Sequence, residues 1–218
     1  QQIAADFNLT LPNAADVGSP YPGAATVRGQ ARQTADGWAV DTDLTGPLGI
    51  AGQVQAQIAK TVAANFNLVL PNAADVGSPF PGAVAARGRL MQTPSGWQVV
   101  TGLSGPAGTT ADITAVLADR LSVNYALQVA DVAALGAPHS GALRATGQAR
   151  QAETGWQVET DVEGPYGMTA TAKGTIGETA AVRYALNLPN AATLGAPFSG
   201  AVALRGEVTK TEGAWRTE

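Results

Sequence analysis

The chain has 218 residues, of which 45% are hydrophobic and 14% are charged, and its net charge of −4 comes without clusters of basic residues. This composition predicts a folded, core-forming protein and excludes an intrinsically disordered one, and the acidic balance argues against a nucleic-acid partner. The absence of cysteine excludes disulfides and thiolate metal sites, and it leaves the redox compartment open.

The chain is a tandem repeat. Its four tryptophans recur at a constant spacing of 59 residues, at Trp38, Trp97, Trp156 and Trp215. Fixed spacing indicates an array in which each unit is completed by its neighbours. We therefore expect one repeat-array domain over 1–218, with repeats at about 4–62, 63–121, 122–180 and, in part, 181–218.

Each repeat is predicted to begin with a half-buried strand. Apolar residues alternate at Phe7, Leu9 and Leu11, and the same alternation returns in the later repeats over 64–70, 123–129 and 182–188. A period of two residues is typical of a strand with one apolar face. Residues 12–23 follow, where an asparagine, small residues, a glycine and prolines predict a connector with one helical turn.

The second and third strands alternate in the same way. The second carries a glycine at one inward position of every repeat, at Gly29, Gly88, Gly147 and Gly206. The third, in the second repeat, has Trp97, Val99, Thr101 and Leu103 on one face and Gln98, Val100, Gly102 and Ser104 on the other. A Gly-Pro pair then predicts a tight turn into a fourth strand, which should start at Ile50 in the first repeat. Short links favour antiparallel neighbours.

About fifteen strands with one apolar face must hide that face. A β-propeller would bury both faces of its inner strands, and an outer-membrane barrel would carry aromatic girdles and bulkier lipid-facing residues. A sandwich or flattened solenoid with a self-filled core is the plainest alternative. The glycine columns favour a fourth arrangement, a sheet curled into a gutter with its apolar face inside, because glycine within a strand marks a bend or a close approach of another backbone.

The expected fold is thus all-β: an antiparallel meander of four-stranded 59-residue repeats, curled into an elongated hydrophobic groove (a β-taco), with a short helical turn in each connector. Residues whose side chains should line this groove, as candidates for lipid contact, are Phe7, Leu9, Val27, Trp38, Val40, Leu44, Ile50, Val54, Phe66, Leu68, Val84, Leu90, Trp97, Val99, Leu103, Ile113, Leu117, Tyr125, Leu127, Leu143, Trp156, Val158, Val162, Met168, Tyr184, Leu186, Val202 and Leu204.

Two segments carry a resemblance to a known family. Residues 196–206 read Ala-Pro-Phe-Ser-Gly-Ala-Val-Ala-Leu-Arg-Gly, and residues 155–167 read Gly-Trp-Gln-Val-Glu-Thr-Asp-Val-Glu-Gly-Pro-Tyr-Gly. Units of this kind resemble the repeats of the TamB (translocation and assembly module) family of the AsmA-like, repeating β-groove superfamily. The resemblance covers nearly the whole chain.

The resemblance implies a location and partners. Proteins of that kind are anchored in the inner membrane of Gram-negative bacteria, span the periplasm and meet an outer-membrane BamA-like protein, TamA. They are implied to carry phospholipid between the membranes or to assist the assembly of outer-membrane proteins and autotransporters. The sequence contains no transmembrane stretch or signal segment and stops within a repeat, so we expect a middle section of a longer array, with the anchor and the partner-binding regions elsewhere.

No set of residues predicts catalysis. His139 is the single histidine, and because Tyr21, Phe80 and Phe198 hold its place in the other repeats, a packing role is favoured over a metal or triad role. Glu159, Asp161 and Glu163 share one strand face and could bind a cation, although a solvated face is the better interpretation. We expect no enzyme, no metal and no cofactor.

Two further features were candidates for ligand contact. Arg28, Arg87 and Arg205 precede the glycine column and could touch lipid headgroups or a partner, but polar outward residues that keep the sheet soluble are favoured. The Gly-Pro-x-Gly segments lack the lysine and the following helix of a phosphate loop, so they are predicted to be turns. The working hypothesis is a periplasmic groove for acyl chains, with client-strand templating or an inert spacer as the alternatives.

Overall fold

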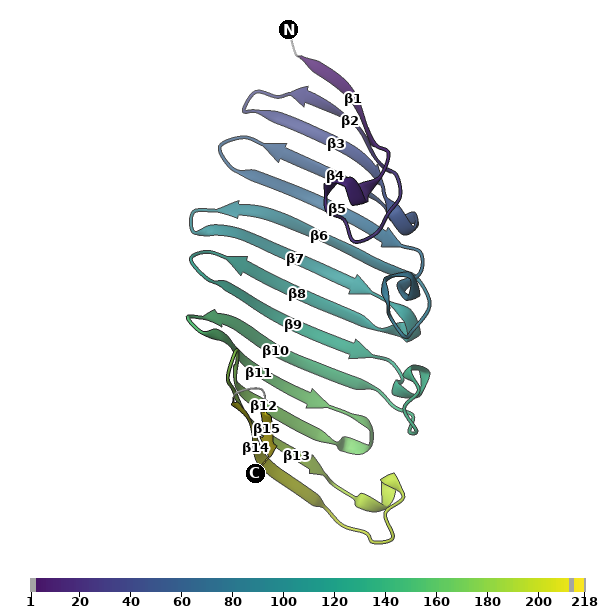
Figure 1. Ribbon diagram of the computed structural model, residues 1–218, viewed down its shortest axis with the longest axis vertical. Helices are drawn as coiled ribbons and strands as arrows, with labels where there is room; N and C mark the ends of the chain where they lie inside the picture. The colour runs from purple at the N-terminus through teal and green to yellow at the C-terminus, as the bar shows by residue number, and fades with distance from the viewer. Residues whose placement is uncertain (1–2, 212–213, 218) are drawn as a thin grey trace. The chain divides into compact units, whose positions relative to one another are not determined.

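The computed structural model describes residues 3–211 and 214–217. Every described strand pairs antiparallel with the next strand in its unit, and the helical elements are short 3-10 turns (Figure 1). The predicted all-β antiparallel meander, with a short helical turn in each connector, is confirmed.

The chain divides into two compact units, residues 1–106 and 107–218. The division falls in the turn that follows the third strand of the second repeat, so it does not coincide with a repeat boundary. The single repeat-array domain over 1–218 stays a prediction.

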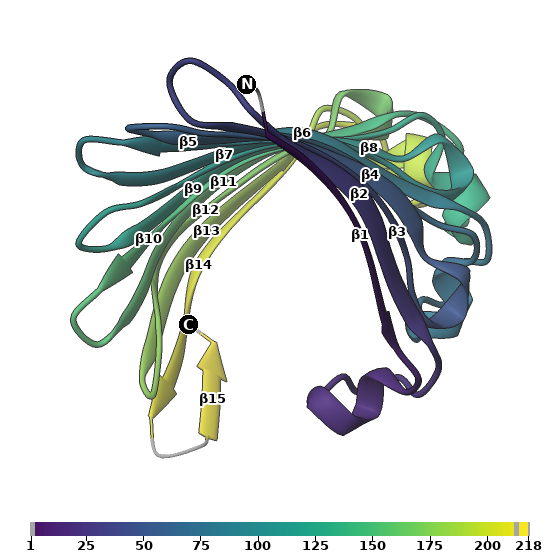
Figure 2. The same cartoon turned by 90° about the horizontal axis from the view of Figure 1, so that it is seen from above.

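Unit 1 contains seven described strands and three described 3-10 turns. They are β1 (Ala4–Leu11), η1 (Ala14–Val17), β2 (Ala25–Gln33), β3 (Trp38–Thr45), η2 (Pro47–Gly49), β4 (Ala51–Ile58), β5 (Val62–Leu70), η3 (Ala73–Val76), β6 (Val84–Thr93) and β7 (Gly96–Ser104). Within this unit, η1 and η3 lie at one end of the strands and the β2–β3 and β6–β7 hairpins lie at the other (Figures 1 and 2).

Unit 2 contains eight described strands. After η4 (Pro106–Gly108), where the two units meet in sequence, come β8 (Thr110–Leu117), β9 (Leu121–Val129), η5 (Val132–Leu135), β10 (Leu143–Ala152), β11 (Gly155–Glu163), η6 (Pro165–Gly167), β12 (Thr169–Ile176), β13 (Ala180–Leu188), η7 (Ala191–Leu194), β14 (Val202–Thr211) and β15 (Ala214–Thr217). Here too η5 and η7 lie at the strand ends opposite the β10–β11 hairpin (Figure 1).

The register keeps each face of the sheet uniform. Phe7 pairs with Gly29, Leu9 with Val27, and the same offset returns one repeat later. Directly paired residues point to the same side of a sheet, so one face collects the apolar positions and the other the polar ones. We call these the apolar face, which bears Phe7 and Leu9, and the polar face, which bears Arg28 and Gln30.

The glycine column is explained by an aromatic side chain. A Cβ atom added to Gly88 would lie 2.4 Å from the carbonyl oxygen of Val100 and 2.7 Å from Cζ of Phe66. Phe66 is the cross-strand partner of Gly88, and its ring covers the glycine. A ring of this kind restores the apolar contact that a strand glycine lacks.

Each long connector is closed by one side chain. The Oδ1 atom of Asn13 accepts from Ala15 N at 3.3 Å and from Gly23 N at 3.1 Å, so it caps η1 and ties down the far end of the loop. Gly18 ends the turn with φ 90°, a left-handed conformation that suits glycine. Asn72, Asp131 and Asn190 each accept the same pair of hydrogen bonds in their connectors.

The predicted start of the fourth strand is wrong by one residue. Ile50 belongs to the Gly-Pro turn, because its N–H donates to Pro47 O at 3.2 Å and its carbonyl accepts from Gly46 N at 2.8 Å, and β4 begins at Ala51. Met168 occupies the equivalent turn position before β12. Two predicted groove residues therefore lie just outside the strands.

The buried core is much smaller than the composition suggests. The buried apolar residues of the described chain are Ala14, Ala73, Val129, Ala145, Ala180, Leu188 and Ala191. Most of them lie in the connectors or where a strand runs into a connector, and no large side chain of the described residues is fully buried. Because each unit is one meander, its strands have no second sheet to pack against. The backbone hydrogen bonds between neighbouring strands and the half-buried apolar side chains hold each unit together.

Candidate ligand-binding faces

The apolar face of unit 1 consists of continuous rows that cross the strands. Cross-strand pairing links the first row through Leu9, Val27, Leu44, Gly52, Leu68, Ala86 and Leu103. The second row runs through Phe7, Gly29, Thr42, Val54, Phe66, Gly88 and Thr101, and the third includes Val40, Leu90 and Val99. Most predicted groove residues of unit 1 therefore share one face.

The tryptophans and three predicted groove valines or leucines lie near the ends of the strands, outside these three rows. Trp38 and Trp97 pair with Gln33 and Gln92 beside the hairpins. At the connector end, Val84 pairs with Leu70 in unit 1. In unit 2 the same positions are the Leu143–Val129 and Val202–Leu188 pairs, in which the partner is buried.

Unit 2 repeats the arrangement with other side chains. Its first row runs through Ala111, Leu127, Ala145, Val162, Ala170, Leu186 and Leu204, and its second through Ile113, Tyr125, Gly147, Thr160, Ala172, Tyr184 and Gly206. Val158 lies in the third row, Trp156 pairs with Gln151 and Ile176, and Leu117 pairs with Leu121. These are the remaining predicted groove residues.

The apolar face is accessible to solvent. Each predicted groove residue is half-buried or exposed, and none is buried. Trp38 is 36% exposed and Leu204 is 51% exposed, whereas an apolar side chain in a closed core would be almost covered. A self-filled core would require these rows to be covered by other parts of the same unit.

One polar pair interrupts the apolar face of unit 2. The hydroxyl of Tyr125 lies 2.6 Å from Oγ1 of Thr160, across Gly147. In unit 1 the corresponding ring is Phe66, and the hydroxyl of Thr101 donates to the carbonyl of Arg87 instead. The two units thus present the same backbone with a different polarity at its centre.

The polar face is held by bonds between neighbouring strands. In unit 1 Gln30 donates to Asp6 at 2.9 Å and Arg32 pairs with Asp41 at 3.1 Å. In unit 2 Gln148 and Lys173 both donate to Glu159, at 3.0 and 3.2 Å. These donors, first Gln148 and then Lys173, hold the pKa of the Glu159 carboxyl below its usual range.

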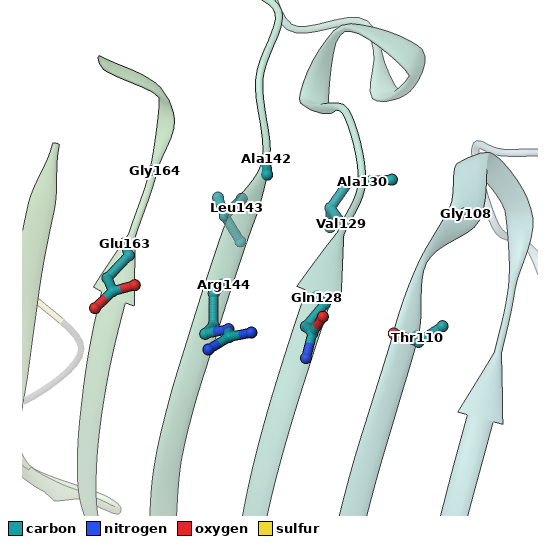
Figure 3. A pocket seen from close by; sticks show the side chains of 10 residues that line it. All are labelled: Gly108, Thr110, Gln128, Val129, Ala130, Ala142, Leu143, Arg144, Glu163 and Gly164. Carbon is teal, nitrogen blue, oxygen red and sulfur yellow. The ribbon is translucent and has the colours of Figure 1, made fainter. Parts of the chain in front are cut away.

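Open hollows in the sheet include residues of the polar face, which the sequence did not indicate. One of about 420 Å³ in unit 2 lies over β8 to β11, where Gln128, Arg144 and Glu163 come from adjacent strands (Figure 3). Another, of about 690 Å³ in unit 1, includes Arg87 and Arg89. The substitution of carboxylates by Val100 and Gly102 in the second repeat was the signal that could have pointed to the latter.

Two of the residues singled out for chemistry, His139 and Glu159, have structural partners. The ring of His139 meets that of Tyr166 edge-on, with the centroids 5.9 Å apart. Glu159 is engaged by Gln148 and Lys173. Within residues 3–211 and 214–217, no group of three or more histidine, aspartate or glutamate side chains is placed to hold a metal ion.

The helices of the described chain are too short to cross a membrane. In comparisons with protein-family profiles, curated proteins and solved structures, the chain finds no match.

Proposed function

We propose that this chain is a section of a bridge-like groove that carries phospholipid acyl chains through the periplasm, between the inner and outer membranes of a Gram-negative bacterium. The observation that supports this most is the accessible apolar face, whose rows are continuous within each unit and contain no buried predicted groove residue. Extended apolar surfaces on folded proteins mark binding surfaces. We further propose that the sheet curls around the bound lipid.

The chemistry of the face suits an acyl chain better than a polar ligand. Each methylene gains about 0.8 kcal/mol when it leaves water. Rows of alanine, valine and leucine recognise apolar shape and offer few hydrogen-bond donors, so many lipids would bind weakly and could move along the rows. The resemblance to TamB repeats adds the inner-membrane anchor and the outer-membrane partner TamA, both through regions outside this section.

A photo-crosslinking amino acid at Val99 or at Gln98 tests the proposal. These neighbours lie on β7, Val99 on the apolar face opposite Leu90 and Gln98 on the polar face opposite Met91. In Gram-negative cells that express the chain in the periplasm, phospholipid adducts are expected at Val99 and not at Gln98. Adducts at neither position, or equally at both, would contradict the proposal.

Charge provides an independent test in the full-length protein. Val99→Arg places a guanidinium on the apolar face and should block lipid passage between the membranes, whereas Gln98→Arg should leave passage unchanged. The measurement is the transfer rate of labelled phospholipid from inner to outer membrane. Equal rates in the two variants would count against the groove.

A further inference from the structure

The polar face of unit 1 contains two arginines without partners. Arg87 and Arg89 are alternate residues on β6, about 7 Å apart along the strand. Both side chains are exposed, and neither guanidinium makes a hydrogen bond or an ion pair with any described residue. Every strand neighbour of these two positions within the unit is uncharged.

The neighbours of the arginines supply more donors. On β5, Asn67 pairs with Arg87 and Asn65 pairs with Arg89, and Gln55 follows on β4. None of these three amides makes a side-chain hydrogen bond to another described residue. On β7 the partners are Gly102, which leaves space beside Arg87, and Val100.

In the other repeats, carboxylates occupy the positions that Val100 and Gly102 hold in the second repeat. The positions of Val100 and Gly102 hold Asp41 and Asp43 in the first repeat, where Arg32 bonds to Asp41 and Gln53 to Asp43. In the third repeat they hold Glu159 and Asp161, and Gln148 and Lys173 bond to Glu159. In the second repeat both positions lack a carboxylate, and Arg89 replaces the glutamine found at Gln30 and Gln148. The donors Arg32 and Gln53 are not kept, because Met91 and Asp112 hold their positions.

An open hollow coincides with this cluster. Its volume is about 690 Å³, and its lining includes Gln55, Asn65, Asn67, Arg87, Arg89 and Val100. Arginine forks bind tetrahedral oxyanions through paired, charge-assisted hydrogen bonds, and side-chain amides can donate to the remaining oxygens. We propose that the hollow is a binding site for a phosphate or pyrophosphate group, independent of the lipid function proposed for the opposite face.

Titration of the 218-residue chain with inorganic pyrophosphate at low ionic strength, followed by calorimetry and by the arginine Nε–H signals, tests the site. Saturable one-to-one binding is expected, weakening as salt is added. Arg89→Gln installs the residue found at Gln30 and Gln148, and Val100→Asp installs the carboxylate of Asp41; each should weaken binding about tenfold or more. Arg28→Gln is the matched control and should leave the affinity unchanged.

A second arm identifies the source of the phosphate. The chain is sedimented with phosphatidylcholine vesicles with and without phosphatidic acid. Sedimentation that needs phosphatidic acid and is lost in Val100→Asp supports the site and assigns it to lipid phosphate, whereas binding of pyrophosphate alone supports it and assigns it to soluble phosphates. Absence of saturable binding in both arms, or equal binding by Val100→Asp and the unmodified chain, overturns the site, and neither result affects lipid adducts at Val99.

Discussion

Units 1 and 2 share the same antiparallel strand pairing and differ in the side chains at the centre of their apolar faces. In unit 1 a phenylalanine, Phe66, covers Gly88, whereas in unit 2 Tyr125 covers Gly147 and is fixed by the hydroxyl of Thr160. The backbone therefore depends on a ring over a glycine, and the hydroxyl is a local addition. The repeats serve as natural variants of one another, so each difference can be transferred from one unit to the other.

The largest expected effect is the loss of the space over the glycine. Gly88→Ala would place a Cβ 2.4 Å from a backbone carbonyl, and we expect it to lower the free energy of unfolding by about 3 kcal/mol. Gly147→Ala should cost more, because its Cβ would also lie 2.6 Å from the hydroxyl oxygen of Tyr125, which is held by Thr160. Urea denaturation measures both.

The control for this pair is Gly46→Ala. Gly46 is extended, with φ −146°, and the nearest atom to an added Cβ is 3.9 Å away. Its stability should change by no more than about 0.5 kcal/mol. If Gly88→Ala were as mild as this control, the covering ring would be incidental to the fold.

An intermediate effect is expected from the hydroxyl pair. Tyr125→Phe turns the centre of unit 2 into that of unit 1 and removes one hydrogen bond, so we expect a loss of about 1 kcal/mol in the free energy of unfolding. Phe66→Tyr makes the reverse change opposite Thr101, whose hydroxyl already donates to the carbonyl of Arg87, and should gain less than Tyr125→Phe loses. Equal and opposite changes would show that the two centres are interchangeable.

The smallest effect at neutral pH, and one that grows in acid, concerns the connector caps. Unit 1 uses Asn13 and Asn72, whereas η5 in unit 2 uses Asp131, whose carboxylate accepts from Gly141 N at 2.9 Å and Ala133 N at 3.0 Å. These N–H groups, chiefly that of Gly141, hold the pKa of Asp131 below its usual range.

A lowered pKa in the folded state fixes the direction of the pH effect. The contribution of Asp131 to stability is present above the unfolded pKa of about 4 and is lost as the pH falls through the folded value. Asp131→Asn should therefore reduce the loss of stability between pH 6 and pH 3. Asn190→Asp should increase it, because Asn190 makes the same two cap bonds and Thr193 stands where Asp75 lies beside Asn72. The urea midpoints at the two pH values are compared, and identical acid sensitivity in all three proteins would exclude the cap as the cause.

The alternating pattern predicted a large part of the architecture. Side chains in a strand alternate between two faces, so the positions of Val99 and Gln98 on opposite faces followed from the pattern alone, and the Asn-Ala-Ala and Gly-Pro segments predicted the connectors because their capping chemistry is local. The start of the fourth strand was missed by one residue. Ile50 closes the turn through backbone hydrogen bonds, which any residue type can make and which the sequence therefore does not reveal.

What the sequence by itself determined is therefore local and periodic: the 59-residue repeat, the two faces of each strand and the capped connectors. The tertiary structure alone decided how far the apolar face is covered, because burial depends on whether another layer packs on it and not on the residues of the face. It also decided that Arg87 and Arg89 lie among amides and not carboxylates, because that depends on the register of β6 against its neighbours β5 and β7.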